Sequence, residues 1–356
     1  MANNEYEKGT EPMKADTKRI RRSSSRLAWK IRWLPVSALL ALPVAASAAT
    51  ASADGPPLCQ GVCATAVVPV APGPAEPFGV TSGPRGSVWF SEDNAIGRVD
   101  QRGQITTYPI PSAHARVGWM TVDQSGGVWF AERFSGKIGR IMPSGAITEF
   151  NLPTPTAGPQ GIVFAPDGNI YVTEQGANAI ARLNPTTGQA TDIKVPTPNS
   201  TTQSGALGSD GAIWFIERSA AKVGRMTLDG AFTEYRLAPG AFPNRIVAGP
   251  DGALWFTELF GGKVGRITTD GALTEFPVGG GPVGIAVGKD GQLYVDLFLG
   301  RGVDRINLQG QVTGHWDLPG AVGPLLITTG FGLDIWVTDG AGGKIYRLTP
   351  YDVGRP

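Results

Sequence analysis

The sequence predicts an all-β protein, a seven-bladed β-propeller built from four-stranded blades. One aromatic position recurs seven times at spacings of 39 to 43 residues, as Trp89, Trp129, Tyr171, Trp214, Trp255, Tyr294 and Trp336. Four short runs of β-branched and aromatic residues surround each recurrence, and turn residues such as Asp-Gly separate them. No run has the length or the 3.6-residue period of a helix. Four strands repeated at this spacing are typical of a propeller, which arranges its sheets in a ring.

Residues 1–53 are predicted to be a signal peptide. Basic residues from Lys18 to Arg32 precede an apolar run from Trp33 to Ala49, and small residues follow up to Ala53. An uncleaved membrane anchor is the alternative, because the run is nearly long enough to span a bilayer. Either interpretation places the folded part outside the cytoplasm, as a secreted or periplasmic protein.

Charge argues against nucleic acid as a partner. Residues 1–32 carry a net charge of +5 and the whole chain +1, so the remainder is acidic at −4. A basic footprint for nucleic acid is therefore not expected on the folded part. We expect a monomer with a small-molecule or peptide ligand, and no membrane contact beyond the signal segment.

A linker, residues 54–65, follows the signal and contains Cys59 and Cys63. A short-loop disulfide between them is one interpretation outside the cytoplasm, and an unpaired linker is the other. The propeller is predicted over residues 66–350, with a tail at 351–356. Blade 7 ends with its third strand, Lys344 to Leu348, so the strand-like residues 66–70 are predicted to dock on blade 7 and close the ring.

Residues that repeat in every blade are expected to serve the blade rather than a reaction. Seven arginines recur in the third strand and are expected to bond neighbouring turns: Arg98, Arg140, Arg182, Arg225, Arg266, Arg305 and Arg347. Carboxylates such as Glu132, Glu174 and Glu217 end the second strand of most blades. They are candidate ligands of a cation at one channel mouth. In the alternative interpretation, each carboxylate forms an ion pair with a nearby basic residue, such as Arg133, Arg218 or Lys263.

The repeated Trp-Phe-Thr-Glu, Lys-x-Gly-Arg-Ile and Thr-Glu-Phe segments are similar to those of the virginiamycin B lyase (streptogramin B lyase) family, over about four-fifths of the chain. The resemblance implies a lyase that opens a cyclic depsipeptide at its ester without adding water, with Mg²⁺ polarising the carbonyl. It also places the base and its partners beside the axis, at the x of Pro-x-Gly. A Tyr is expected there in blade 1, a His in blade 6 and a Glu-Pro-His run in blade 7.

This sequence departs from the family pattern at all three places. Phe78, Val283 and Leu325 occupy them, and none of these side chains takes up a proton. The two histidines, His114 and His315, lie elsewhere in the repeats. A general base must reach the proton that it removes, so no catalytic residue is carried across.

The channel mouth is instead predicted to bind an uncharged or peptide-like ligand. Three of the seven x positions carry amides, and their opposite side is apolar, which suits a desolvated ligand. The predicted contact residues are Phe78, Gln160, Gln203, Asn244, Arg116, Trp119 and Arg245.

The sequence is compatible with three functions. The first is an exported propeller of the lyase type that binds a ligand without catalysis and needs no cofactor. The second is a carbon–oxygen lyase with Mg²⁺ and a displaced base, for which Glu132, Glu174 or Glu217 would need a raised pKa. The third is a calcium-dependent lactonase, for which Asn244 and Asp296 are the remaining candidates.

Overall fold

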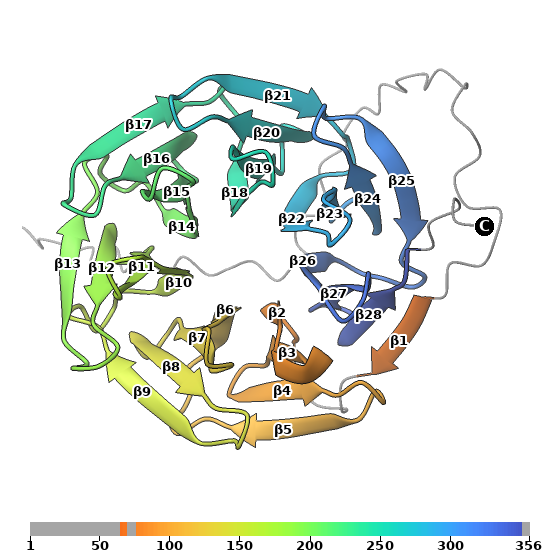
Figure 1. Cartoon of the computed structure of the whole chain (residues 1–356), viewed down its shortest axis with the longest axis horizontal. Helices are drawn as coiled ribbons and strands as arrows, with labels where there is room; N and C mark the ends of the chain where they lie inside the picture. The colour runs from red at the N-terminus through yellow and green to blue at the C-terminus, as the bar shows by residue number, and fades with distance from the viewer. Residues whose placement is uncertain (1–64, 70–75, 351–356) are drawn as a thin grey trace, which may run out of the picture. The chain divides into compact units, whose positions relative to one another are not determined.

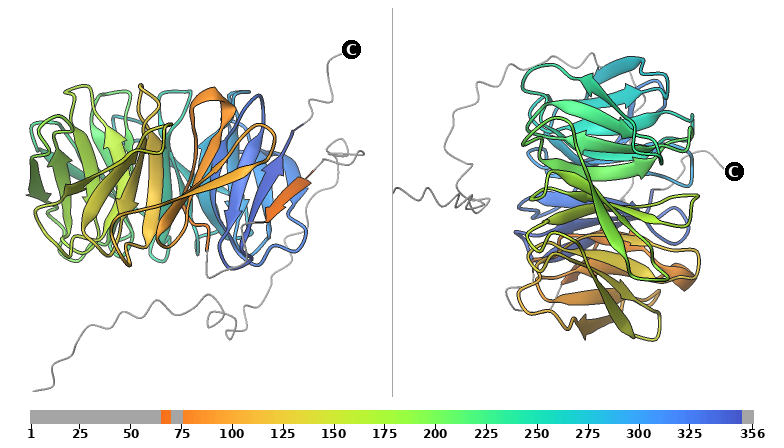
Figure 2. Two further views of the ribbon diagram at one scale, coloured as in Figure 1. Left: turned by 90° about the horizontal axis from the view of Figure 1, so that it is seen from below. Right: turned by 90° about the vertical axis from the view of Figure 1, so that its left-hand side faces the viewer.

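The computed structural model describes residues 65–69 and 76–350, which form a ring of seven antiparallel sheets of four strands each (Figure 1). The chain divides into two units, Met1–Ser47 and Ala48–Pro356, and every described residue belongs to the second. The predicted signal peptide, Cys59, Cys63 and the tail lie outside the described residues. The predicted fold class, an all-β seven-bladed propeller, is confirmed. Figure 2 shows the ring from the side, with the strands running from one face to the other.

The first strand of each blade lies nearest the ring axis. These inner strands are β2 (Val80–Ser82), β6 (Val117–Val122), β10 (Pro159–Phe164), β14 (Thr202–Leu207), β18 (Pro243–Ala248), β22 (Pro282–Val287) and β26 (Pro324–Thr329). The second strands are β3 (Val88–Ser91), β7 (Val128–Glu132), β11 (Ile170–Glu174), β15 (Ile213–Glu217), β19 (Leu254–Glu258), β23 (Leu293–Leu297) and β27 (Ile335–Asp339). A 3₁₀ turn, η2 (Pro84–Gly86), precedes β3.

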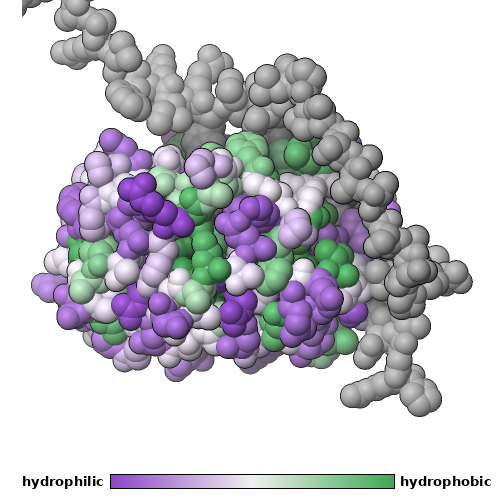
Figure 3. Space-filling model, turned by 90° about the horizontal axis from the view of Figure 1, so that it is seen from above, coloured by the Kyte–Doolittle hydropathy of each residue, from purple (hydrophilic) through white to green (hydrophobic). Residues whose placement is uncertain are grey.

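The third strands are β4 (Ala95–Val99), β8 (Lys137–Ile141), β12 (Ala179–Leu183), β16 (Lys222–Met226), β20 (Lys263–Ile267), β24 (Gly302–Ile306) and β28 (Lys344–Leu348). The outer strands are β5 (Ile105–Pro109), β9 (Ile147–Asn151), β13 (Ala190–Lys194), β17 (Phe232–Arg236), β21 (Leu273–Pro277) and β25 (Val312–Asp317), with β1 (Thr65–Pro69) in blade 7. The outer strands are only partly buried, and Figure 3 shows hydrophilic residues between hydrophobic patches on the rim of the ring. Among the described helical segments, none is long and apolar enough to cross a membrane.

Blade 7 takes its outer strand from the other end of the chain. β1 pairs antiparallel with β28, from Thr65 opposite Leu348 to Pro69 opposite Lys344. Blade 7 therefore has four strands although the C-terminal part of the chain supplies only three of them. That this pairing holds the ring closed in solution stays a prediction.

The recurring aromatic residues pack between neighbouring sheets. Trp214 in blade 4, for example, is fully buried in one cluster with Leu254 and Phe256 of blade 5. Sheets that pack face to face in this way bury the apolar side of each strand, and this burial is the main source of stability.

A repeated glycine in the third strand allows this packing. At Gly97, Gly139, Gly224 and Gly265, the space a Cβ would occupy is filled by the ring of a phenylalanine on the second strand. For Gly265 that residue is Phe256, its partner in the β19–β20 register. The Lys-x-Gly-Arg segment therefore needs glycine for a steric reason, the close approach of an aromatic ring.

The repeated arginines bond the hairpin turns, as predicted. In blade 2, Arg140 Nε donates to Asp123 Oδ2 at 2.9 Å, and the guanidinium lies over the ring of Trp129. Equivalent arginine–aspartate ion pairs recur in five further blades, Arg182–Asp167, Arg225–Asp210, Arg266–Asp251, Arg305–Asp290 and Arg347–Asp334. Each of these arginines therefore joins the third strand to the hairpin turn between the first two strands of its own blade.

Candidate ligand site at the ring axis

The x positions of the Pro-x-Gly segments meet at one face of the ring. Each inner strand begins where the second strand ends, as in the pairs Pro243–Glu258 and Pro282–Leu297. We call this face the mouth face. In blades 2 to 7 the register shifts directly after the first pair, so the x residue lies at an irregularity of the ladder. Such bulges re-aim a side chain, which sets these residues apart from the regular strand.

The three predicted amides are buried and mostly engaged with the protein. Gln160 Nε2 donates to Gln175 Oε1 at 2.9 Å, and Asn244 Nδ2 donates to the carbonyl of Val283 at 3.0 Å. Gln203 is 2% exposed, and its Oε1 has no hydrogen-bond partner among the described residues. Gln203 thus has a buried acceptor oxygen that no described residue uses.

Arginine–aromatic stacks between different blades are the main feature of the mouth face. The guanidinium of Arg245 lies 4.2 Å from the ring centroid of Trp119, although β18 and β6 belong to opposite sides of the ring (Figure 1). Two further stacks join Arg133 to Phe78 at 5.6 Å and Arg218 to Phe242 at 5.0 Å. These six residues form the axial cluster: Phe78, Trp119, Arg133, Arg218, Phe242 and Arg245.

The axial cluster is one connected network. Phe78 meets Trp119 edge to face, with the ring centroids 6.5 Å apart. Arg218 donates through Nη2 to Asn244 Oδ1, directly beside Arg245. Three predicted contact residues, Phe78, Trp119 and Arg245, are therefore brought together by the fold.

Two members of the network were assigned another role from the sequence. The sequence offers Arg133 and Arg218 as candidate partners of the preceding glutamates, but both guanidinium groups stack on aromatic rings. Neither oxygen of Glu217 has a hydrogen-bond partner among the described residues, so the pair of Arg218 with Glu217 does not form. Each arginine directly follows the end of a second strand, β7 or β15. An arginine at this position occurs in only two of the seven blades, and this was the sequence signal for a role outside the repeated architecture. Arg116, also predicted, lies beside the cluster, over the ring of Phe134, and pairs at 3.7 Å with Glu76.

The electrostatics of the axial cluster are those of crowded cations. Burial, reinforced by the charge of Arg116, lowers the pKa of Arg133 to about 10. Burial and the charge of Arg133 lower the pKa of Arg218 to about 9, and burial lowers that of Arg245 to about 10. Arginine still carries its charge at neutral pH, so the cluster is positive.

One carboxyl group, Asp296, lies next to the cluster. It is fully buried, neither of its oxygens has a side-chain partner among the described residues, and burial raises its pKa to about 7. Electrostatic attraction links it to Arg245. The corresponding position in the other blades carries Ser91, Ala131, Thr173, Ile216, Thr257 or Thr338, so Asp296 is specific to blade 6.

The glutamates at the ends of the second strands do not ring the mouth. Glu132, Glu174 and Glu217 are 0% exposed and lie within their own blades. Glu132 accepts a hydrogen bond from Ser135 Oγ at 2.6 Å. The lysines of the third strand pair instead with the outer strand, as Lys137 does with Glu149 at 2.7 Å and Lys263 with Glu275.

Burial, with repulsion from the acid on the outer strand, raises the pKa of Glu174 to about 8 and of Glu217 to about 7, and burial raises that of Glu132. No group of three or more His, Cys, Asp or Glu side chains suited to a metal occurs among the described residues. The predicted cation site is therefore not assembled in this part of the chain.

The lactonase-type candidates do not form a calcium site either. Asn244 Oδ1 accepts a hydrogen bond from Arg218, so a cationic side chain already holds the oxygen that a metal would need. Ca²⁺ takes 6–8 oxygen ligands, and arginine beside them opposes binding.

The positions at which the family resemblance places its base hold apolar side chains. Phe78 belongs to the axial cluster, Val283 is 8% exposed, and Leu325 follows Pro324 at the start of β26. His315 lies on the outer strand β25, with Nδ1 2.6 Å from Asp304 Oδ1. His114 lies in the exposed segment before β6, with a φ of 55°.

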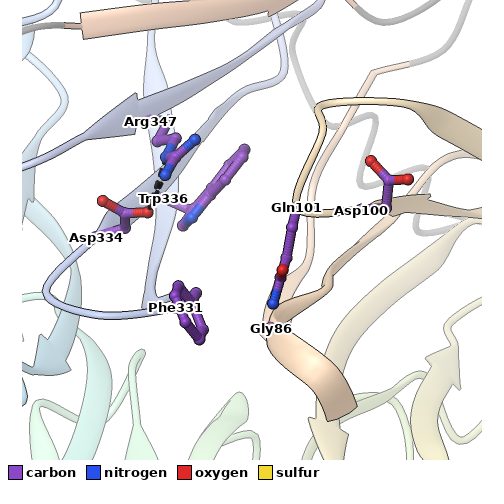
Figure 4. Close-up of a pocket in the computed structure, with 7 residues that line it drawn as sticks. All are labelled: Gly86, Asp100, Gln101, Phe331, Asp334, Trp336 and Arg347. Atoms are coloured by element: carbon purple, nitrogen blue, oxygen red, sulfur yellow. Dashed lines mark hydrogen bonds and ion pairs between the residues drawn. The ribbon is translucent and has the colours of Figure 1, made fainter.

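The opposite face carries a small pocket between blades 7 and 1 (Figure 4). It measures about 210 Å³ and is lined by Phe331, Asp334, Trp336 and Arg347 from blade 7 and by Gly86, Asp100 and Gln101 from blade 1. Asp334 is occupied by Arg347 Nε at 2.8 Å and by Thr349 Oγ1 at 2.7 Å. Because these bonds repeat the blade architecture, the pocket offers little chemistry of its own.

Comparison with known proteins supports a relationship over most of the chain. The model of the virginiamycin B lyase family matches residues 63–280 and 163–353. A streptogramin B lyase structure is 32% identical, covering 80% of this chain and 97% of that one, with a TM-score of 0.76. The virginiamycin B lyase of Staphylococcus aureus, in selenomethionine form, gives 32% identity, 81% and 99% coverage and a TM-score of 0.76.

The catalytically inactive His-to-Ala variant of that Staphylococcus aureus enzyme with quinupristin gives the same values, 32%, 81%, 99% and 0.76. No curated protein matches the sequence.

Proposed function

Because this chain belongs to the virginiamycin B lyase family, we propose that it is a ligand-binding propeller that holds a small or peptide-like molecule at its mouth face without opening an ester. One observation carries the proposal. The three positions where the family resemblance expects a base and its partners hold Phe78, Val283 and Leu325, and the axial cluster occupies the same face. Elimination needs a group that takes up a proton, and these side chains cannot.

Displaced catalysis is less well supported. Glu132, Glu174 and Glu217 have the raised pKa values that a base would need, but all three are 0% exposed. A base within hydrogen-bond reach of the substrate is a condition for proton transfer. Asp296, the carboxyl group beside Arg245, has a pKa that burial raises to about 7, but it is 0% exposed like the three glutamates.

The quinupristin assay tests the absence of lyase activity. The purified chain is incubated with quinupristin and Mg²⁺, beside the Staphylococcus aureus virginiamycin B lyase as a positive control. Elimination opens the ring without a change of mass, whereas hydrolysis adds one water, so chromatography with mass spectrometry separates the two outcomes. We expect neither product from this chain. A ring-opened product of unchanged mass would establish the lyase function, and a product with added water would establish a hydrolase.

Binding at the mouth face is tested with the buried amide that keeps an available acceptor. Peptides from an N-acetylated library that raise the melting temperature are titrated by calorimetry into wild type and Gln203→Leu. We expect Gln203→Leu to weaken binding at least fivefold. Gln309→Leu is the matched control, since Gln309 is exposed near the outer strand of blade 6. Equal affinity for both variants would place the site elsewhere.

We also propose that residues 1–53 direct export. The supporting pattern is the basic, apolar and small-residue order of that segment. N-terminal sequencing of the protein recovered from outside the cytoplasm is expected to begin near residue 54. A mature protein that retains Met1 would contradict cleavage.

A further inference from the structure

Building on the proposed mouth-face site, we infer that its ligand carries a carboxylate group on an apolar or aromatic body. Arg133, Arg218 and Arg245 come from blades 2, 4 and 5 and meet around one axis. This inference narrows the uncharged or peptide-like ligand expected from the sequence to one that carries a negative charge.

The first argument is uncompensated charge. Among the described residues, Arg218 and Arg245 make no ion pair within 4.0 Å, whereas six repeated arginines of the third strands each pair with an aspartate. Asp296 is the one nearby carboxyl group that attracts Arg245. Like charges held together in a partly dry environment destabilise the protein, and a bound anion would offset that repulsion.

The second argument is the orientation of the donors. A guanidinium that stacks on a ring through its face presents its N–H groups at the edge, in the plane that suits a planar carboxylate. Arg218 uses Nη2 on Asn244, but its Nε is buried without a hydrogen-bond partner, as is the Nε of Arg245. Trp119 Nε1 is a third buried donor without a partner among the described residues. An oxyanion at this place would satisfy donors that nothing described in the protein satisfies.

The third argument is the apolar rim. Phe134, Phe260 and Leu299 follow the second strands of blades 2, 5 and 6, and Val322 precedes the inner strand of blade 7. All four lie on the mouth face, with 59%, 59%, 67% and 50% exposure. Exposed apolar residues gathered around a polar centre mark binding surfaces. The rim therefore favours a ligand whose charged group is attached to an apolar body.

Polyanions fit the surface less well. The chain beyond residue 32 carries a net charge of −4, which repels nucleic acid and anionic membranes. Arg218 and Arg245 are partly buried near the axis, which suits one small anionic group better than an extended polyanion. A phosphate monoester would present similar oxygens, so it enters the test as the competing class.

The test compares an acid with its neutral amide. N-acetyl-L-tryptophan, N-acetyl-L-tryptophanamide and phenyl phosphate are titrated by calorimetry into the full chain. We expect the acid to bind at least tenfold more tightly than the amide and more tightly than phenyl phosphate. Arg218→Gln is expected to weaken binding of the acid at least tenfold and to leave the amide unchanged. Arg236→Gln, on the exposed outer strand of blade 4, removes the same charge and is expected to change neither.

Several results would overturn the inference. Equal affinity for acid and amide would leave a mouth-face site without the carboxylate preference, and tighter binding of phenyl phosphate would assign the site to phosphates. No measurable binding of the acid would also refute it. If Arg218→Gln lowers the melting temperature, Arg218→Lys serves as the second variant, because it keeps the positive charge but loses the paired N–H donors of the guanidinium group. Opening of quinupristin would instead refute the proposed function, so the two failures are distinguishable.

Discussion

Removal of the charge on Asp123 is expected to destabilise the propeller by a calculable amount. Asp123 Oδ1 accepts hydrogen bonds from Ser125 and from the amide of Gly127, and Oδ2 accepts from Trp129 Nε1 and Arg140 Nε. Burial alone would raise the pKa of this carboxyl, but these hydrogen bonds outweigh burial and lower it from 3.8 to about 2. At about 1.4 kcal/mol per pKa unit, Asp123→Asn should lower the free energy of unfolding at pH 7 by about 2 kcal/mol.

The sign of the pH dependence follows from the lowered pKa. The stabilisation is present above the unfolded-state pKa of 3.8 and is lost as the pH falls through about 2. Urea unfolding followed by tryptophan fluorescence should therefore show the full deficit of the variant at pH 7 and a smaller one at pH 3. Asp93→Asn is the control, because the side chain of Asp93 makes no hydrogen bond or ion pair with a described residue. A deficit below about 0.5 kcal/mol at pH 7, or an equal deficit at both pH values, would refute the reasoning.

Three further predictions concern the scaffold. Gly265→Ala should destabilise the protein by about 1–3 kcal/mol, because the ring of Phe256 fills the space that the methyl group needs; unchanged urea unfolding would contradict this. A shortened chain that begins at residue 76 lacks β1 and should melt below a chain that begins at residue 60, whereas equal melting temperatures would show that the β1–β28 pairing does not hold the ring closed. Glu174→Gln should raise stability at pH 9, because burial and Asp192 raise the pKa of Glu174 to about 8 and its ionisation opposes folding; the gain should disappear near pH 4, and a gain of equal size at pH 4 would contradict it.

The repeated features of the propeller could be predicted from the sequence because each is specified seven times. The spacing of the aromatic residues predicted the number of blades, and the arginines of the third strand were correctly assigned to the turns. A single motif can be assigned to more than one structure, but a motif that recurs in every blade must fit the same assignment seven times. Residues that occur once receive no such support.

The axial cluster shows why the site was harder to predict. Arg133 and Arg218 stand beside glutamates in the sequence, and proximity along the chain suggested ion pairs. Adjacent strand residues point to opposite sides, so the glutamate enters the blade while the arginine turns toward the axis. Arg245 and Trp119, which stack on each other, are 126 residues apart in the sequence and belong to different blades. Nothing in the local sequence indicates that these two blades contact each other through their side chains.

The bridge formed by Arg245 and Trp119 affects how a ligand can pass along the axis of the ring. A side chain of blade 5 contacts a side chain of blade 2, so these two side chains narrow the centre of the ring at that depth. We therefore expect a molecule that binds at the mouth face to rest against this bridge and to leave by the same face.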